Sequence, residues 1–367
     1  MRGAWMPFPL TMATGRVRFQ RADRRRIGEE IEARGRTNSQ PLRRGRLLPG
    51  VRQMEAASQT MTLPKLMALH CFCCLTCGFG CKESNESNTQ ASIAFLSDEM
   101  LAEDGGKGFQ GFTMTADGGN RKRTSATDRQ IGYLTISPSG KRLAYRAYDP
   151  EFGSRKGWGI WLVGPEFDKP FRMKVDGDCL EPAFSPDEKT LVFSSNFDGN
   201  FDVYSIPFAG GPRRRLTATP DAVEALPSFS YDGSMICFVR ADDSGTQIWT
   251  LTIGTGEERM VTSDDAAKAF PRFSPDGRKI VYSSRGPNQN EIREVTLATG
   301  KTSTIAADSS DNDCPSYLDD RHVVFHSNRT GKYQIYILDI GKNEMRRLPS
   351  DANDRLPVVA WRSRASE

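Results

Sequence analysis

The stretch PRFSPDGRKIVYSS, residues 271–284, recurs with changes along the C-terminal three quarters of the chain. Its relatives lie at residues 136–145, 182–195, 227–238 and 315–325. The steps between equivalent positions are 48, 45, 44 and 44 residues, counted at Ile136, Phe184, Phe229, Phe273 and Tyr317. A nearly fixed period of this size indicates an array of repeated structural units.

Each repeat reads as four short strands. Proline opens the first strand, where its missing N–H costs no ladder bond, and Ser-Pro-Asp-Gly then forms a turn with glycine at the positive-φ position. The second strand is a continuous apolar run, the third alternates, and the fourth is short and charged, as at 280–282, 334–338 and 213–217. Four antiparallel strands in about 45 residues, repeated radially, describe a β-propeller blade.

The two ends of the chain supply one blade between them. Residues 356–361 read as a first strand, but the other three strands of that unit do not follow it. Three candidate strands lie instead at 93–96, 109–114 and 121–124, and joining them to the last strand closes the ring. We therefore predict an all-β, six-bladed propeller over residues 93–361, with five continuous blades and one composite blade.

Residues 1–60 differ from the rest of the chain in charge. They contain 13 Arg, no Lys and 5 acids, a net charge of +8, so the remainder carries −4 of the total of +4. Without apolar periodicity such a segment cannot bury enough surface to fold alone. Three interpretations stay open: sequence upstream of the true start, a disordered basic tail, or an organelle transit peptide. No paired motif supports a nucleic-acid arm, so we expect no nucleic-acid partner.

Residues 61–81 read as an export signal. Lys65 precedes an apolar run of about 15 residues, too short to span a bilayer comfortably, which ends at Cys81. Residues 78–81 resemble the lipobox of bacterial lipoproteins, whose cysteine is acylated, although Phe79 stands where a small residue is usual. An ordinary cleavable signal is the alternative. We expect lipidation at Cys81, a flexible tether at 82–92, and a periplasmic or outer-membrane lipoprotein.

The ring offers few candidates for catalysis or metal binding. Its two histidines, His322 and His326, point to the same side of one strand, so a metal pair is an alternative to stacked polar positions. Cys179, Cys237 and Cys314 fall in different blades, and Cys237 takes a core position. The sequence has no G-x-S-x-G elbow and no phosphate-binding loop. We expect no cofactor, and we favour binding over catalysis. The repeated aspartates, at Asp187, Asp232 and Asp276, are interpreted as turn residues.

Different blades converge at the channel mouth of a closed ring, and the segments that lead into the first strands form it. The candidate binding residues in these segments are Asp178, Glu181, Glu224, Lys268, Asp313, Asp354 and Arg355. Acids outnumber bases in this set, so a cationic or hydrogen-bonding partner is favoured. Reversing the charges of Glu224 and Asp354 together is expected to abolish binding without changing the melting temperature.

The repeat also carries a family resemblance. Pro-x-Phe-Ser-Pro-Asp-Gly, an apolar strand ending in Ser-Ser, and Asn-x-x-Gly-x-x-x-Ile-Tyr are similar to the WD-like repeats of TolB-type six-bladed propellers. The resemblance covers residues 93–361 and implies an envelope protein whose propeller binds other proteins. In that family TolB carries an α/β domain before the propeller, and here only a short tether separates Cys81 from Ile93, so the resemblance does not include that domain.

Two classes of function stay open. The first is a non-enzymatic propeller, monomeric and held at the membrane by its lipid anchor, that binds an envelope protein or peptide. The second is a carbohydrate-active or sugar-binding propeller. It is similar to related lyases that act on pectin fragments, but those enzymes hold a metal with several histidines.

Overall fold

The structure, a computed structural model, describes residues 91–99, 109–124, 131–149, 157–165, 169–173, 175 and 177–360. The predicted segments 1–60 and 61–81, with Cys81, and nearly all of the tether 82–92 lie outside the described residues. Every regular element in the described part is a β-strand. Among these residues there is no helix of the length and apolarity needed to cross a membrane.

Five blades are continuous in sequence, and each is a four-stranded antiparallel sheet. Blade 1 consists of β4 (Ile131–Ile136), β5 (Leu143–Asp149), β6 (Gly157–Val163) and β7 (Phe171–Arg172). Blade 2 consists of β8 (Cys179–Phe184), β9 (Thr190–Ser195), β10 (Asp202–Pro207) and β11 (Arg214–Arg215). Blade 3 consists of β12 (Val223–Phe229), β13 (Met235–Asp242), β14 (Gly245–Thr252) and β15 (Glu258–Met260).

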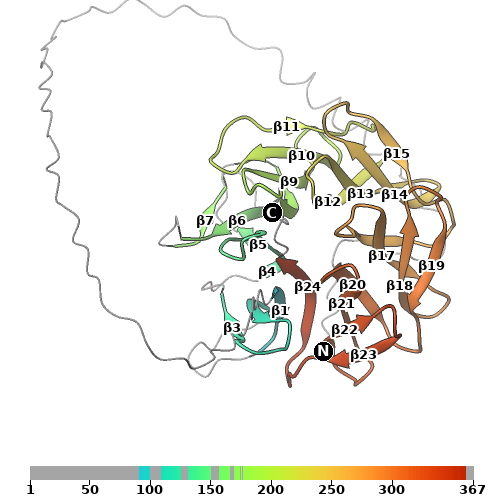
Figure 1. The fold of residues 1–367 in the computed structure, drawn as a ribbon. Coiled ribbons are helices and arrows are strands. Elements are labelled where there is room, and N and C mark those ends of the chain that lie inside the picture. The colour runs from blue at the N-terminus through green and yellow to red at the C-terminus, as the bar shows by residue number, and fades with distance from the viewer. Residues whose placement is uncertain are drawn as a thin grey trace, which may run out of the picture. The chain divides into compact units, whose positions relative to one another are not determined.

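The next two blades follow the same pattern. Blade 4 consists of β16 (Lys268–Phe273), β17 (Lys279–Arg285), β18 (Asn290–Thr296) and β19 (Thr302–Ala306). Blade 5 consists of β20 (Asn312–Tyr317), β21 (His322–Ser327), β22 (Gln334–Asp339) and β23 (Glu344–Arg347). In each of the five, the first strand lies innermost and the last strand lies at the outer edge (Figure 1).

The sixth blade is composite, as predicted. Its strands are β24 (Asp354–Ala360), β1 (Ser92–Ser97), β2 (Gln110–Thr115) and β3 (Lys122–Arg123), paired in that order. β24 and β1 are antiparallel, with Ile93 opposite Val359 and Ala94 opposite Val358. Figure 1 shows the red strand β24 beside the blue-green strand β1, where it closes the ring. The six-bladed architecture predicted from the repeat is confirmed.

The core lies between the blades. Each of the six apolar clusters joins side chains of two neighbouring blades. The cluster between blades 3 and 4, for example, packs Cys237 and Ile248 against Phe273 and Tyr282. Cys237 is fully buried, which confirms its predicted core position. Because both faces of every sheet are apolar, the neighbouring blades keep each sheet dry.

The turns between first and second strands follow the chemistry expected of Ser-x-Asp. Ser274 Oγ donates to Asp276 Oδ1 at 2.6 Å, and Asp276 Oδ1 also accepts the backbone N–H of Arg278 at 3.0 Å. A serine hydroxyl bonds the aspartate at 2.6 Å in the equivalent turns of Asp187 and Asp232. The serine bond lowers the pKa of both of these carboxyls. The interpretation of these aspartates as turn residues is confirmed.

Five of the six innermost strands contain a bulge beside the repeated proline, where the strand register slips. The residue before proline takes a φ between 45° and 58° at Glu181, Leu226, Phe270, Cys314 and Leu356. Such values are rare for residues other than glycine and cost about 1–3 kcal/mol each. Because a bulge re-aims the side chains beside it, these strands can present residues to the ring axis.

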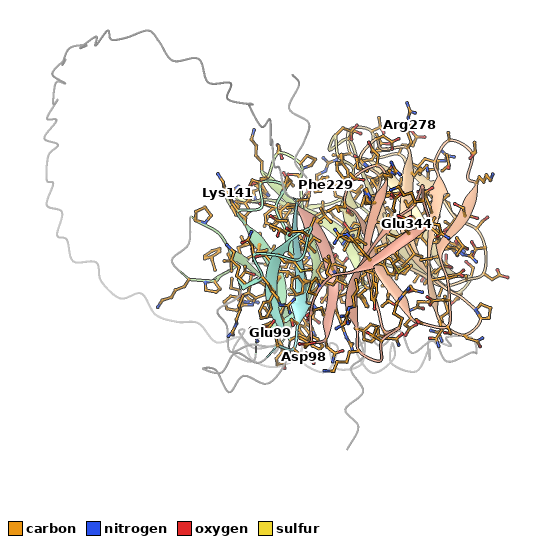
Figure 2. The ribbon with its side chains drawn as sticks, turned by 60° about the horizontal axis from the view of Figure 1, so that its bottom comes forward. Asp98, Glu99, Lys141, Phe229, Arg278 and Glu344 are labelled. Atoms are coloured by element: carbon orange, nitrogen blue, oxygen red, sulfur yellow. The ribbon has the colours of Figure 1, made fainter. Side chains whose placement is uncertain are left out.

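The strand order gives the ring two distinct ends. The turn face carries the links between first and second strands, at 137–142, 185–189, 230–234 and 274–278. The loop face carries the links between second and third strands and the links from one blade to the next. Figure 2 shows Lys141 and Arg278, of the turn face, at one end and Asp98 and Glu99, of the loop face, at the other.

Ring closure makes a first prediction. Val359 of β24 is 2% exposed and packs in the cluster between blades 5 and 6. Replacing it with alanine removes two buried methyl groups, so V359A should lower the free energy of unfolding by about 2 kcal/mol. Urea denaturation measures this. The control is M260A at the outer edge of blade 3, where Met260 is 47% exposed and the loss should stay below about 0.5 kcal/mol. Equal effects of the two substitutions would contradict the closure.

Candidate functional site

The innermost strands β4, β8, β12, β16, β20 and β24 surround a narrow axis. An axial cavity of about 30 Å³ is lined by Thr135, Ile136, Pro138, Ala183, Phe184, Ser228, Phe229, Tyr231, Arg272, Phe273, Ser316, Val358 and Val359. Arg272 and Val358 also line a second cavity of about 10 Å³. Pockets for drug-sized ligands measure about 300–1,000 Å³, so this axis has no room for a sugar ring between the described residues.

Three of the predicted acids are buried in ion pairs. Glu224 is fully buried; Arg240 Nε donates to its Oε1 at 2.6 Å, as does Thr219 Oγ1 at 2.9 Å. The guanidinium of Arg121 binds both carboxylate oxygens of Asp354 at 2.9 Å. These two pairs lie within single blades and tie strands of one sheet together.

Glu181 pairs across a blade interface. Arg146 of blade 1 donates to its carboxylate at 3.1 Å, and both side chains are almost fully buried. Burial raises the pKa of Glu181, and the Arg146 charge opposes that rise. Because a buried carboxylate is costly without a partner, the pair makes blades 1 and 2 depend on each other.

The four remaining predicted residues differ in their surroundings. Lys268 is buried and bonds the side chain of Asp264 at 2.9 Å. Asp178 accepts the backbone N–H of Trp158 at 2.9 Å. Asp313 lies beside Cys314, and Arg355 stacks over the Tyr333 ring at 4.1 Å. The structure therefore spreads the seven residues around the loop face rather than gathering them in one cluster.

The excess of acids in the sequence is compensated by arginines that the channel-mouth set did not include. Glu181, Glu224 and Asp354 each face a guanidinium, and Lys268 faces a carboxylate. Reversing the charges of Glu224 and Asp354 would put like charges together in buried sites, so the expectation of an unchanged melting temperature is wrong. The binding role of the seven residues stays a prediction.

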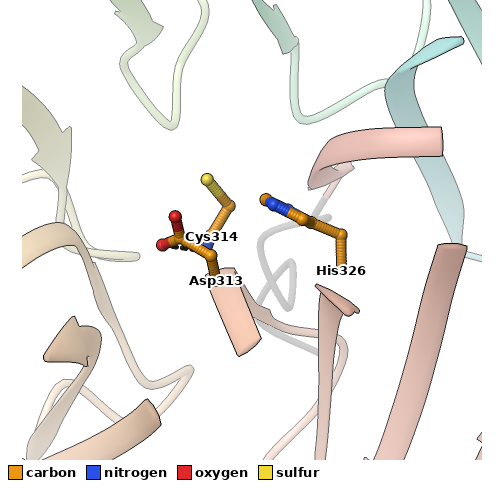
Figure 3. A group of neighbouring side chains, drawn as sticks. All are labelled: Asp313, Cys314 and His326. Atoms are coloured by element: carbon orange, nitrogen blue, oxygen red, sulfur yellow. Dashed lines mark hydrogen bonds between the residues drawn. The ribbon is translucent and has the colours of Figure 1, made fainter. Parts of the chain in front are cut away.

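Asp313, Cys314 and His326 form a compact group near the axis (Figure 3). One ligand-type atom of each lies within 4.8 Å of the others. The second histidine of the strand is elsewhere, because His322 Nδ1 contacts the Asp319 carboxylate at 2.9 Å. The two histidines of β21 therefore do not form a metal pair.

The chemistry of the group does not suit a metal ion. His326 Nδ1 accepts the backbone N–H of Leu356 at 3.3 Å, so the neutral ring carries its proton on Nε2 and has no free lone pair. Burial raises the pKa of Cys314 well above its usual range, which opposes the thiolate that a metal needs. Burial lowers the pKa of His326, and the positive charge of Arg355 lowers it further and would repel a cation. We interpret the group as a packed wall of the channel.

The loop face of blades 1 and 2 carries aromatic side chains that the sequence did not single out. Tyr148 and Phe197 are 39% and 40% exposed, and Tyr148 meets the Trp158 ring edge to face at 5.6 Å between centroids. Asp178 joins the two sides of this patch, since it accepts the N–H of Trp158 and donates its own N–H to Asn196 Oδ1, each at 2.9 Å. We call Tyr148, Trp158 and Phe197 the aromatic patch.

The group around Asp313 makes a prediction about pH. Burial raises the pKa of Asp313 to about 6 and lowers that of His326 to about 3, against about 3.9 and 6.5 in an unfolded chain. The Asp313 contribution to stability is lost as the pH rises from about 4 to 6, whereas the His326 contribution appears over a similar range. In the parent protein the two groups therefore change the free energy of unfolding in opposite directions as the pH rises.

Removing one of the two side chains should therefore reveal the pH dependence of stability that the other one causes. Relative to the parent, the free energy of unfolding of His326→Asn should fall between about pH 4 and pH 6, and that of Asp313→Asn should rise. Urea denaturation across this range measures both curves. The curve of unfolding free energy against pH for the double variant should be parallel to that of the parent. Curves of the single variants that are also parallel to the parent's would contradict the assignment.

Comparison with known proteins agrees with this geometry. A family model described as the TolB beta propeller domain matches residues 85–318 and 247–362. The chain is 28% identical over 149 residues to the Protein TolB homolog of Chlorobium luteolum, a match that covers 40% of this chain and 32% of that protein. The chain thus spans about a third of the length of this curated relative.

Two solved structures have the same fold. TolB from Acinetobacter baumannii has a TM-score of 0.61 and 21% identity, covering 74% of this chain and 67% of that one. A putative TolB from Agrobacterium tumefaciens has a TM-score of 0.56 and 18% identity, covering 71% of this chain and 88% of that one. With the family model matching most of the chain, from residue 85 to residue 362, this chain belongs to the TolB β-propeller domain family.

Proposed function

We propose that the chain is a non-enzymatic binding propeller of the bacterial cell envelope and that its partner is a protein or a peptide. Membership of the TolB β-propeller domain family supports this role, and the aromatic patch on the loop face is the observation that carries it. Aromatic residues and arginine are the types most enriched in protein interfaces, and arginines lie against two of the three rings of the patch.

Arginines support the patch at both ends. Arg213 stacks over the Phe197 ring at 3.2 Å, and Arg146 lies 4.7 Å from the centroid of the Trp158 ring. Arg146 is held in turn by Glu181, one of the predicted binding residues. The rings are thereby fixed before a partner arrives, which lowers the entropy cost of binding. A partner peptide can cover the exposed ring faces and use Asp178 as a polar contact at the rim.

The rigid blades leave little room for an enzyme site on the axis. The axial cavity of about 30 Å³ is far smaller than a pocket for an oligosaccharide. No feature of the described residues favours the carbohydrate-active alternative over binding, so we propose the binding function alone.

Photo-crosslinking tests the patch. A benzoylphenylalanine at position 197 or 148 should crosslink to a protein or peptide of the envelope fraction, giving the same discrete product from both positions. The control is benzoylphenylalanine at Met260, which is 47% exposed at the outer edge of blade 3 and should give no such product. Phe197→Ala should weaken capture of the identified partner by roughly tenfold or more, with the fold intact. Equal crosslinking from all three positions, or none from the patch, would refute the proposal.

We also propose that Cys81 anchors the protein in the membrane through an acylated N-terminus. The basic, apolar and cysteine-ended segment 61–81 supports this. Mass spectrometry of the native protein should find a diacylglyceryl group on Cys81 as the first residue, and Cys81→Ser should release the propeller from the membrane fraction. An unmodified N-terminus produced by cleavage at another position would show a plain export signal instead.

A further inference from the structure

Arg272 is a half-buried cation on the ring axis, without a carboxylate partner among the described residues. It comes from β16 and lines both cavities of the axis. Its Nη2 donates to Tyr133 Oη at 2.5 Å and its Nη1 to the carbonyl of Pro271 at 3.0 Å. A guanidinium has five N–H donors, so three remain for which the described residues supply no acceptor. A charge that is partly removed from water in this state is costly unless something else neutralises it.

The acids nearest to this guanidinium do not cancel its charge. Tyr133, which holds Arg272, also feels the field of Glu181, but the Glu181 carboxylate is bound by Arg146 at 3.1 Å. Arg146 therefore already compensates the charge of this carboxylate. Cys314 stays a neutral thiol, because burial raises its pKa. The local charge on the axis is positive, opposite to the balance that the channel-mouth residues imply.

Three hydroxyl groups face the same cavity. Thr135, Ser228 and Ser316 are 5%, 8% and 6% exposed and stand at the position of Arg272 in their own blades. All three residues line the cavity together with Arg272. A hydroxyl is a donor that can turn toward an anion, so the axial cavity offers one charged and three neutral donor groups.

We propose that the axial cavity is an anion site in which Arg272, Thr135, Ser228 and Ser316 bind one small monovalent anion. The cavity of about 30 Å³ has room for a halide ion or for a carboxylate group, and none for a phosphate ester or a sugar. Pro138 and Tyr231, on the turn-face side, lie at the rim of the cavity and mark the side from which the anion enters. This site is independent of the aromatic patch, which lies on the opposite face.

The carboxylate and the halide have the same chemistry at the site but come from different sources. A halide is taken from solution and completes the core of the ring. A carboxylate comes from an acidic side chain or C-terminus that a second molecule inserts along the axis from the turn face. The experiment below separates these sources, since only the second requires a peptide.

The melting temperature of the purified protein, measured at different anion concentrations, tests whether the anion binds. Sodium chloride replaces sodium gluconate at constant ionic strength, because gluconate is too large for the cavity. Binding to the native state should raise the melting temperature by roughly 2–4 °C for each tenfold rise in chloride above the dissociation constant. Formate should act in the same way. A melting temperature that does not depend on the anion would mean that water alone fills the cavity and would overturn the proposal.

Substitutions test the donors. Arg272→Met keeps a long apolar side chain and removes the buried charge, so it should fold, melt no lower than the parent in gluconate and lose the response to chloride. Thr135→Val should weaken the response, whereas the control Thr250→Val, another buried threonine whose hydroxyl faces Arg259 O at 3.5 Å, should leave it unchanged. A full chloride response in Arg272→Met would overturn the assignment.

Two further measurements locate the anion and its source. Crystals grown in sodium bromide should show an anomalous peak within hydrogen-bond distance of the Arg272 guanidinium, and a peak confined to the surface would refute the site. If the source is a partner, an acidic peptide with a free C-terminus should stabilise the protein more than formate does, and its fully amidated form should not. Equal effects of formate and both peptides assign the site to a free ion. Because neither readout uses the aromatic patch, failure here leaves the proposed partner binding intact.

Discussion

No blade of this protein can exist alone, because each sheet has two apolar faces and the next blade is what covers them. The six clusters of buried side chains all lie at blade interfaces, so the stability of the molecule is shared around the ring. The pairing of β24 with β1 is the contact that turns a row of five blades and two loose ends into a closed body. The narrow axis, the turn face and the loop face are all consequences of that closure.

Because the closed ring buries its inner strands, charged side chains on these strands need partners. The ion pairs of Glu224, Asp354 and Lys268 lie within single blades, and the pair of Glu181 and Arg146 spans two. These groups hold the strands that lead into the axis, which accounts for polar residues at buried positions of the innermost strands. Arg272 departs from the pattern, since no acid of the described residues faces it. At the axial cavity the polar groups are therefore this arginine and the hydroxyl residues Thr135, Ser228 and Ser316.

The repeat made the fold predictable. A period near 45 residues, glycine and proline at fixed turn positions, and a lone first strand at residues 356–361 give the blade, the number of blades and the closing strand. The bulges at Glu181 and Phe270 could not be predicted from the sequence, because a non-glycine residue before proline is normally expected to have a negative φ.

The site was harder to predict than the fold. Partners such as Arg121 for Asp354 lie 233 residues away in the sequence, so the compensation of the acids depends on tertiary pairing. Aligning the repeats with one another would have drawn attention to Arg272. It is the one charged residue at a shared inner position whose other members are uncharged, namely Thr135, Ala183, Ser228, Ser316 and Val358. The exposed rings of Tyr148 and Phe197 fall in stretches with no repeat consensus, so nothing in the repeat pattern groups them.

The position of β24 has a consequence for biosynthesis. β1 and β24 lie at opposite ends of the propeller sequence, so the inner edge of β1 stays unpaired until all the intervening blades have been made. A long interval between synthesis of the two halves of one sheet slows the final step and leaves an open edge that other chains can join. A chain truncated before residue 354 would therefore keep this open edge and be prone to aggregation, even though five of its blades are complete.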